Sequence, residues 1–171
     1  MKTIHIEAFD KSSVDKAIEE IKAIKKEWKR KTSQAENLIA EELANLINEN
    51  LMNVIIADDL KDIKTHQEVH RAPGVEARAK GNTVTIYGEN AVFIEFGAGI
   101  YHNGGEVNNP LSEAVQFDTS IGSYGKGHGN QKYWFVAHNL ISCGTPAYMP
   151  IYEAIETIKP MIPTIVRQVF V

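Results

Sequence analysis

The sequence predicts an α+β fold: a small, mainly antiparallel sheet with a long N-terminal helix and C-terminal helices, in a single domain over residues 1–171. Apolar side chains recur at helical spacing through much of the first 55 residues. Short runs rich in β-branched residues flank turn signals further along the chain. The length of 171 residues fits one domain, and a domain of this size buries about 70% of its unfolded surface.

The chain begins with a pattern typical of a short strand. Residues Thr3–Phe9 alternate between apolar and polar side chains. Three apolar side chains share one side: Ile4, Ile6 and Ala8. Ser12 or Ser13 then offers an N-cap oxygen to a following helix.

Two helices are expected next, with a break near Thr32. The first helix has four apolar residues on one face: Val14, Ile18, Ile21 and Trp28. Ser33 and Glu36 have the spacing of a capping box, which favours a second start. The seven-residue spacing that continues to Ala35 leaves a single helix as the alternative. From Ala35 a broad apolar stripe runs for roughly 24 residues, or about 36 Å, and packs either on the sheet of its own subunit or on a neighbour.

Two hairpins are predicted after this helical part. Gly81-Asn82 separates Val75–Lys80 from Thr83–Tyr87 and is a two-residue turn signal. Tyr133–Val136 and Leu140–Ser142 form the second candidate hairpin. The polar stretch over residues 58–71 is expected to be irregular.

The C-terminal part predicts two short helices or one kinked helix. Pro150 suits the first turn of a helix, where its missing N–H group has no partner to lose. Pro160 and Pro163 prevent a straight continuation.

A glycine-rich segment over residues 97–132 organises the second half of the chain. Eight of the twelve glycines lie within it, and dense apolar sequence flanks it on both sides. A connection this long in a compact domain is usually functional or disordered. The residues directly before this segment, Ala91–Phe96, are compatible with a buried strand or a short helical turn.

Glu95 lies between Ile94 and Phe96, so its carboxylate is expected to be partly desolvated and to need hydrogen-bond donors. Backbone N–H groups of the turn over Gly97 to Gly99 are the predicted donors. This predicts that Glu95 anchors the segment, and that Glu95→Gln loosens it while domain stability stays nearly unchanged.

Three pieces in order carry a resemblance to a known family: Glu95-Phe96-Gly97-Ala98-Gly99, the later glycine series with Trp134, and the closing residues 144–152. In this order they resemble the neck and tail-completion (head-to-tail joining) proteins of long-tailed bacteriophages and prophages. The match runs from about Gly81 to the C-terminus. Ala98 stands where many relatives would have Thr, so no hydroxyl contact is implied there.

The resemblance implies a structural protein, not an enzyme, that forms a ring of identical copies with six as the expected number. Its implied partners are the head connector or head-closure proteins and the tail-terminator or tail-tube proteins, and its implied locations are the virion neck and, during assembly, the host cytoplasm. The expected interface and anchor residues are Glu95, Phe96, Gly97, Gly99, Gly125, Gly127, Gly129, Trp134, Pro146, Met149 and Pro150.

Charge offers an alternative function. The net charge is −4, but the segment over residues 22–31 carries six basic residues against Glu27, which leaves +5 there and −9 elsewhere. Four members are candidates for a DNA-facing patch in a nucleic-acid-binding module: Lys25, Lys26, Lys29 and Arg30. A solvated helix face is the other interpretation.

The sequence gives little support to catalysis, and no cofactor or metal is expected. His66, His70 and Cys143 are the candidates for a hydrolase, yet His66 and His70 lack the metalloprotease order and Cys143 has no recognisable orienting group. The lone cysteine fits a reducing compartment. No apolar run approaches the ~20 residues that cross a bilayer, and the acidic residues near the start argue against a signal peptide, so an unexported protein without membrane contact is expected.

Overall fold

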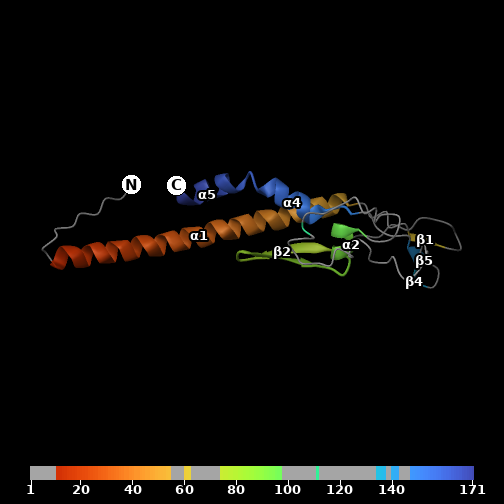
Figure 1. Cartoon of the computed structure of the whole chain (residues 1–171), viewed down its shortest axis with the longest axis horizontal. Coiled ribbons are helices and arrows are strands. Elements are labelled where there is room, and N and C mark those ends of the chain that lie inside the picture. Colours follow the sequence, from red (N-terminus) through yellow and green to blue (C-terminus); the bar gives the residue numbers. More distant parts are fainter. Residues whose placement is uncertain are drawn as a thin grey trace.

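The computed structural model describes residues 11–54, 60–62, 74–97, 111, 134–137, 140–142 and 147–171. The elements in chain order are α1 (Lys11–Asn53), β1 (Leu60–Asp62), β2 (Glu76–Lys80), β3 (Thr83–Tyr87), α2 (Ala91–Phe96), β4 (Trp134–Ala137), β5 (Leu140–Ser142), α4 (Pro150–Ile158) and α5 (Ile162–Phe170). A long N-terminal helix, antiparallel strands and C-terminal helices confirm the predicted α+β class (Figure 1). The predicted strand over Thr3–Phe9 lies outside the described residues.

The helix α1 is one continuous rod of 43 residues. The predicted break near Thr32 is therefore wrong, and the single-helix alternative is correct. A capping box satisfies N–H groups only where a helix starts, whereas here the preceding turn satisfies them. No Gly or Pro interrupts α1, so nothing in the sequence forces an end. Ser12 and Ser13 likewise lie inside the helix and do not precede it.

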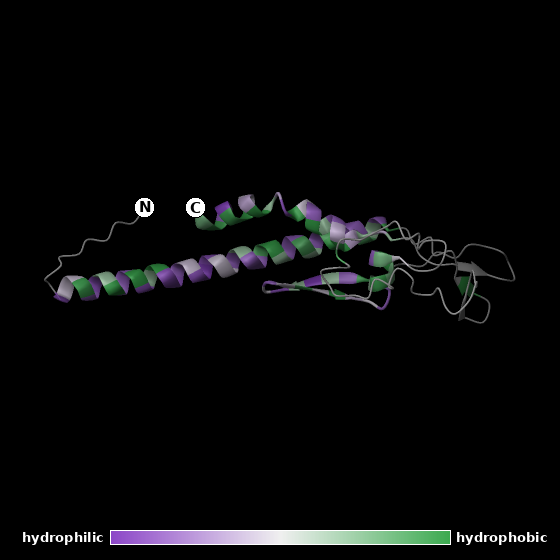
Figure 2. Ribbon diagram, viewed as in Figure 1, coloured by the Kyte–Doolittle hydropathy of each residue, from purple (hydrophilic) through white to green (hydrophobic). Residues whose placement is uncertain are grey.

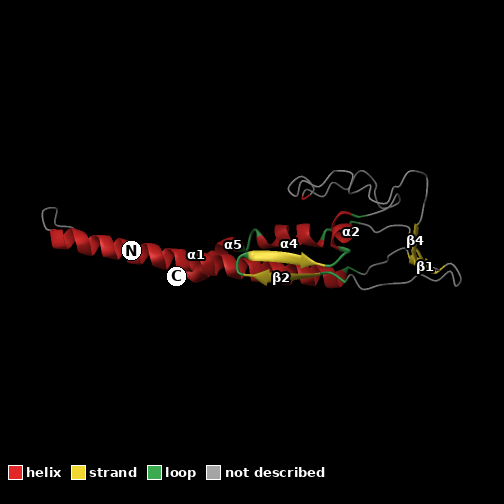
Figure 3. Cartoon of the chain, turned by 90° about the horizontal axis from the view of Figure 1, so that it is seen from below, coloured by secondary structure: helices red, strands yellow, loops and turns green. Residues whose placement is uncertain are grey.

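The first predicted hairpin is confirmed. The strands β2 and β3 pair antiparallel from Glu76 opposite Tyr87 to Lys80 opposite Thr83. Gly81 begins the two-residue turn with φ 61°, a conformation that glycine adopts without penalty. Figure 3 shows the hairpin lying along the C-terminal half of α1.

The second predicted hairpin is also present, but in a separate sheet. The strands β4 and β5 pair antiparallel, and β1 pairs with β5, which gives the order β1-β5-β4. The strand β1 falls within the stretch that the sequence predicted to be irregular. Its three residues are too short to show a period, so this strand could not be recognised from sequence.

The hydrophobic core lies where the C-terminal half of α1 meets the hairpin, α2 and α4. Its fully or nearly fully buried members are Ala44, Ile47, Leu51, Val54, Ala77, Ile94 and Ala154. The predicted apolar stripe after Ala35 therefore packs on its own subunit. Alanines in α1 and β2 allow these backbones to approach closely.

The N-terminal half of α1 is different, because it extends past every other labelled helix and strand (Figures 1 and 3). At its base α5 packs alongside, where the Trp28 and Phe170 rings make an edge-to-face contact with centroids 5.7 Å apart. Pro160 ends α4 and leads into α5, as the proline spacing predicted. Apolar residues remain exposed on the projecting rod: Val14, Ile18, Ile21 and Trp28.

Replacing Ile47 tests the assignment of the core. Ile47 is 1% exposed, and Ile47→Ala is expected to lower the free energy of unfolding by about 2–4 kcal/mol, because it removes buried methyl groups and leaves a cavity. Met52 on the same helix is 77% exposed, so Met52→Ala is the matched control. Denaturant unfolding of both variants measures the difference, and equal stability losses would show that the core is elsewhere.

Candidate functional site

The candidate site is centred on Glu95, whose carboxylate is buried inside the molecule. The short helix α2 carries it between Ile94, which enters the core, and Phe96. Glu95 is only 1% exposed. A carboxylate removed from water to this extent requires hydrogen-bond donors around it.

Those donors come from the first turn of α4. The N–H group of Ile151 donates to Glu95 Oε2 over 2.8 Å, and the N–H group of Tyr152 donates to Oε1 over 3.1 Å. The first N–H groups of any helix lack intrahelical partners, and the helix dipole favours an anion there. Glu95 thus performs for α4 the task of an N-cap residue, from a position 56 residues earlier in the chain.

The start of α4 depends on this remote cap. Met149 occupies the N-cap position with no side-chain hydrogen bond to the helix and adopts a left-handed conformation, φ 54° and ψ 39°. That conformation costs a non-glycine residue about 1–2 kcal/mol. Pro150 follows at the first helical position, as predicted, and is buried.

A third bond joins the same two segments. The N–H group of Tyr148 donates to the Ile94 carbonyl over 2.9 Å. Gly97 ends α2 with φ 76°, and its N–H group donates to the Phe93 carbonyl over 2.8 Å. The end of α2 and the residues just before α4 are therefore held beside one another.

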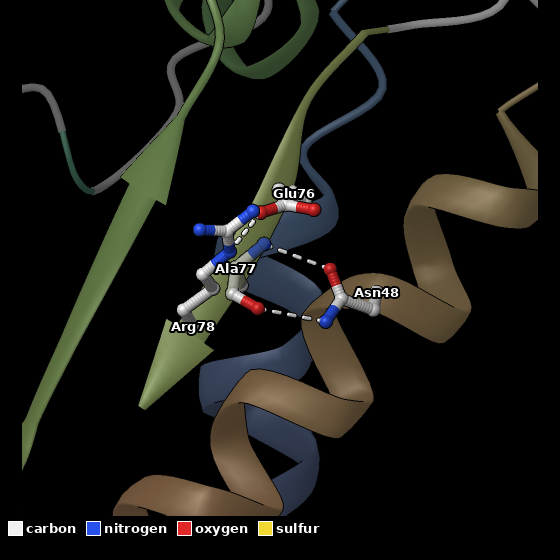
Figure 4. A network of polar contacts seen from close by, with 4 residues as sticks. All are labelled: Asn48, Glu76, Ala77 and Arg78. Atoms are coloured by element: carbon white, nitrogen blue, oxygen red, sulfur yellow. Dashed lines mark hydrogen bonds and ion pairs between the residues drawn. The ribbon is translucent and has the colours of Figure 1, made fainter. Parts of the chain in front are cut away.

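Two asparagines of α1 fix the neighbouring elements to that helix: Asn48 holds the hairpin and Asn50 holds the start of α4. Asn48 donates to the Ala77 carbonyl and accepts from the Ala77 N–H group, both over 2.8 Å (Figure 4). Asn50 donates to the Pro150 carbonyl over 3.0 Å. Sequence analysis missed both residues, because asparagines between apolar residues of a helix look like part of its solvent-exposed face. No local signal could have found their partners.

The structure brings together five of the predicted anchor residues: Glu95, Phe96, Gly97, Met149 and Pro150. Trp134 lies in β4. The remaining predicted positions lie outside the described residues: Gly99, Gly125, Gly127, Gly129 and Pro146. The N–H groups of Gly97 to Gly99 were predicted to donate to the Glu95 carboxylate. The Gly97 N–H group instead donates to the Phe93 carbonyl at the end of α2, and residues 98 and 99 lie outside the described part.

The basic residues lie away from this site, on α1. The side chains of Lys25, Lys26, Lys29 and Arg30 are all exposed. Lys26, Lys29 and Arg30 line one shallow surface groove together with the polar side chains of the next two turns of α1. Arg30 also lies 3.4 Å from the Gln34 side-chain oxygen.

Within the described residues, no group of three or more His, Cys, Asp or Glu side chains is placed to hold a metal ion. His66, His70 and Cys143 lie outside the described residues. The described helices include none that is long and apolar enough to span a bilayer.

Comparisons with known proteins give no family assignment. No family model, no curated protein and no solved structure matches this chain.

The remote cap predicts a stability loss for Glu95→Gln. The glutamine amide keeps one acceptor oxygen, but it turns an NH₂ group toward one of the two N–H donors, so one buried hydrogen bond is lost. We expect the free energy of unfolding to fall by about 1–3 kcal/mol. This exceeds the nearly unchanged stability expected from sequence, because the carboxylate supports a core helix. Chemical unfolding measures the loss. Glu153→Gln, at an exposed position in the first turn of the same helix, is the control and should cost only a few tenths of a kcal/mol.

Proposed function

We propose that this protein is a structural component of the head-to-tail joint of a long-tailed bacteriophage or prophage. In this proposal its copies assemble as a ring between the head connector or head-closure proteins and the tail-terminator or tail-tube proteins. It acts in the virion neck, after assembly in the host cytoplasm, and catalyses no reaction. The passing DNA runs through the ring.

The observation that supports this most is the contact between two of the three segments that carry the sequence resemblance. Residues 95–97 and 148–152 are separated by about fifty residues, yet Glu95 bonds to the N–H groups of Ile151 and Tyr152. This contact fits an architectural role better than a reaction site, because the Glu95 carboxylate is occupied by backbone donors.

The exposed surface also suits assembly. The N-terminal half of α1 presents Ile18, Ile21 and Trp28 at 44%, 52% and 62% exposure. Figure 2 shows hydrophobic residues recurring along this projecting rod. Apolar residues that share one face of a helix require a partner surface. A ring needs two different patches that meet between neighbours, and this face of α1 and the glycine-rich segment over residues 97–132 are our candidates.

Deleting the gene from its phage or prophage tests the role directly. We expect lysates to contain DNA-filled heads and completed tails that are not joined, visible by negative-stain electron microscopy. Supplying the wild-type chain in trans should restore joined particles. Normal virions in the deletion, or a block before tails or heads are complete, would contradict the proposal.

A nucleic-acid-binding module remains a second candidate, because Lys25, Lys26, Lys29 and Arg30 are all solvent-exposed on consecutive turns of α1. Phosphate contacts by exposed lysine and arginine give affinity without sequence preference. In the ring proposal the same four residues would face the DNA channel.

Salt dependence tests this candidate. If these four residues each neutralise one phosphate, duplex affinity should fall about 100-fold between 50 and 200 mM salt. Changing all four to Gln should abolish the binding measured by fluorescence anisotropy, whereas changing Lys16 and Lys80 should have a small effect. Absence of duplex binding at low salt would eliminate this candidate.

A further inference from the structure

The two edges of the β2–β3 hairpin differ in whether their outward backbone groups are hydrogen-bonded. Lys80 and Thr83 flank a two-residue turn, so they form a hydrogen-bonded pair. The next residue along each strand, and every second residue after it, directs its N–H and C=O groups away from the hairpin. On β2, Ala77 is such a residue, and the Asn48 side chain occupies both of its groups (Figure 4). The β2 edge is thereby closed at its centre.

Within the part of the chain that the structure describes, the β3 edge is open. Val84 and Ile86 are the residues whose backbone groups point outward, and within the described part of the chain neither makes a backbone hydrogen bond outside the hairpin. The strand reads Thr-Val-Thr-Ile-Tyr. Charged residues and proline are the usual features that block an edge strand, and this strand contains neither. Such an edge is a template for an added strand.

The described residues also place this edge far from the tip of α1. A Cβ atom at Gly81 would lie 3.8 Å from the Asn37 side-chain oxygen, so the hairpin turn lies beside Asn37. From Lys11 to Asn37 the straight helix spans about 39 Å at 1.5 Å per residue. The rest of β3 lies further away, because Ile86 pairs with Ala77, and Ala77 is bonded to Asn48.

Residues Thr3–Phe9 cannot line β3 of their own chain. Thr3 is eight residues before Lys11, and eight fully extended residues span at most about 26–29 Å, which is less than the distance from Lys11 to the nearest end of β3. The strand predicted over Thr3–Phe9 ends two residues before Lys11, within about 7 Å of the tip. The β3 edge of another copy is not subject to this limit.

We propose that residues Thr3–Phe9 of one copy add as a strand to the β3 edge of a second copy. The side-chain pattern fits, because Val84 and Ile86 pack against the core while Thr85 is exposed. Ile4, Ile6 and Ala8 continue the apolar face beside Val84 and Ile86. Thr3, His5 and Glu7 then lie on the outer face with Thr85.

The exposed apolar side chains next to the tip support the same contact. Val14 and Ile18 are 36% and 44% exposed, one and two turns from Lys11. A strand that enters a neighbour's sheet brings this part of α1 against that neighbour, where these side chains are covered. The strand donor and the strand acceptor are different surfaces, so the interface is heterologous and leads to a ring if the rotation closes.

This inference rests on the part of the proposed function in which copies of the chain assemble with one another, not on the location of the assembly. It is tested on the purified full chain. A mixture of two proteins, both with Cys143→Ser, is oxidised: one carries Thr85→Cys and the other a single cysteine at position 3, 4, 5, 6 or 7.

We expect mixed disulfides to alternate with position. Cysteines at 3, 5 and 7 share a face with position 85 and should link several-fold more than those at 4 and 6, because bridging requires Cα atoms within about 7 Å. Arg78→Cys, on the same face of β2, replaces Thr85→Cys as a matched control and should link less. Adding Ile6→Pro to the His5→Cys partner should abolish the link, and adding Ile6→Val should preserve it.

Three results would overturn the inference: no mixed disulfide, linkage without the alternation, or a predominant disulfide between two Thr85→Cys chains. The last would show that β3 pairs with itself. Because the readout is a cross-link between purified chains, it is independent of whether heads and tails are joined in phage lysates.

Discussion

The rest of the structure depends on the burial of the Glu95 carboxylate against the N-terminus of α4. Each half of this contact is unfavourable alone, since a buried carboxylate needs donors and the first N–H groups of a helix need acceptors. Together, the bonds of 2.8 and 3.1 Å from Ile151 and Tyr152 satisfy both. They also hold Met149 in its left-handed conformation and keep Pro150 at the first helical position, next to Asn50 of α1.

The second constraint is the length of α1. Its C-terminal half supplies the buried residues of the core, including Ile47 and Leu51. Its N-terminal half projects beyond the other described elements and exposes apolar side chains such as Trp28 (Figures 1 and 2). One rigid helix thus links a packed body to a distant tip. Such a shape is suited to contacts between subunits, and it places Lys11 far from the hairpin.

Features set by neighbouring residues were predictable from sequence. Gly81-Asn82 specifies the hairpin turn, and the prolines at 150 and 160 specify where α4 begins and ends. The capping-box spacing of Ser33 and Glu36 was misleading, because a local motif does not stop a helix that lacks a breaker. Sequence also identified Glu95 as an anchor, but not that α4 supplies donors, and it missed the Asn48 contact. These partners lie 56 and 29 residues away, and such separations leave no local signal.

The central claim is that Glu95 caps α4, and amide hydrogen exchange in the native protein measures this most directly. In the wild-type chain we expect the Ile151 and Tyr152 amides to be protected, although first-turn amides of a helix normally exchange quickly because they lack partners. In Glu95→Gln their protection should drop selectively, while the Leu51 amide in the core stays protected. Equal protection of both first-turn amides in the two proteins would show that another group caps the helix and would contradict the account.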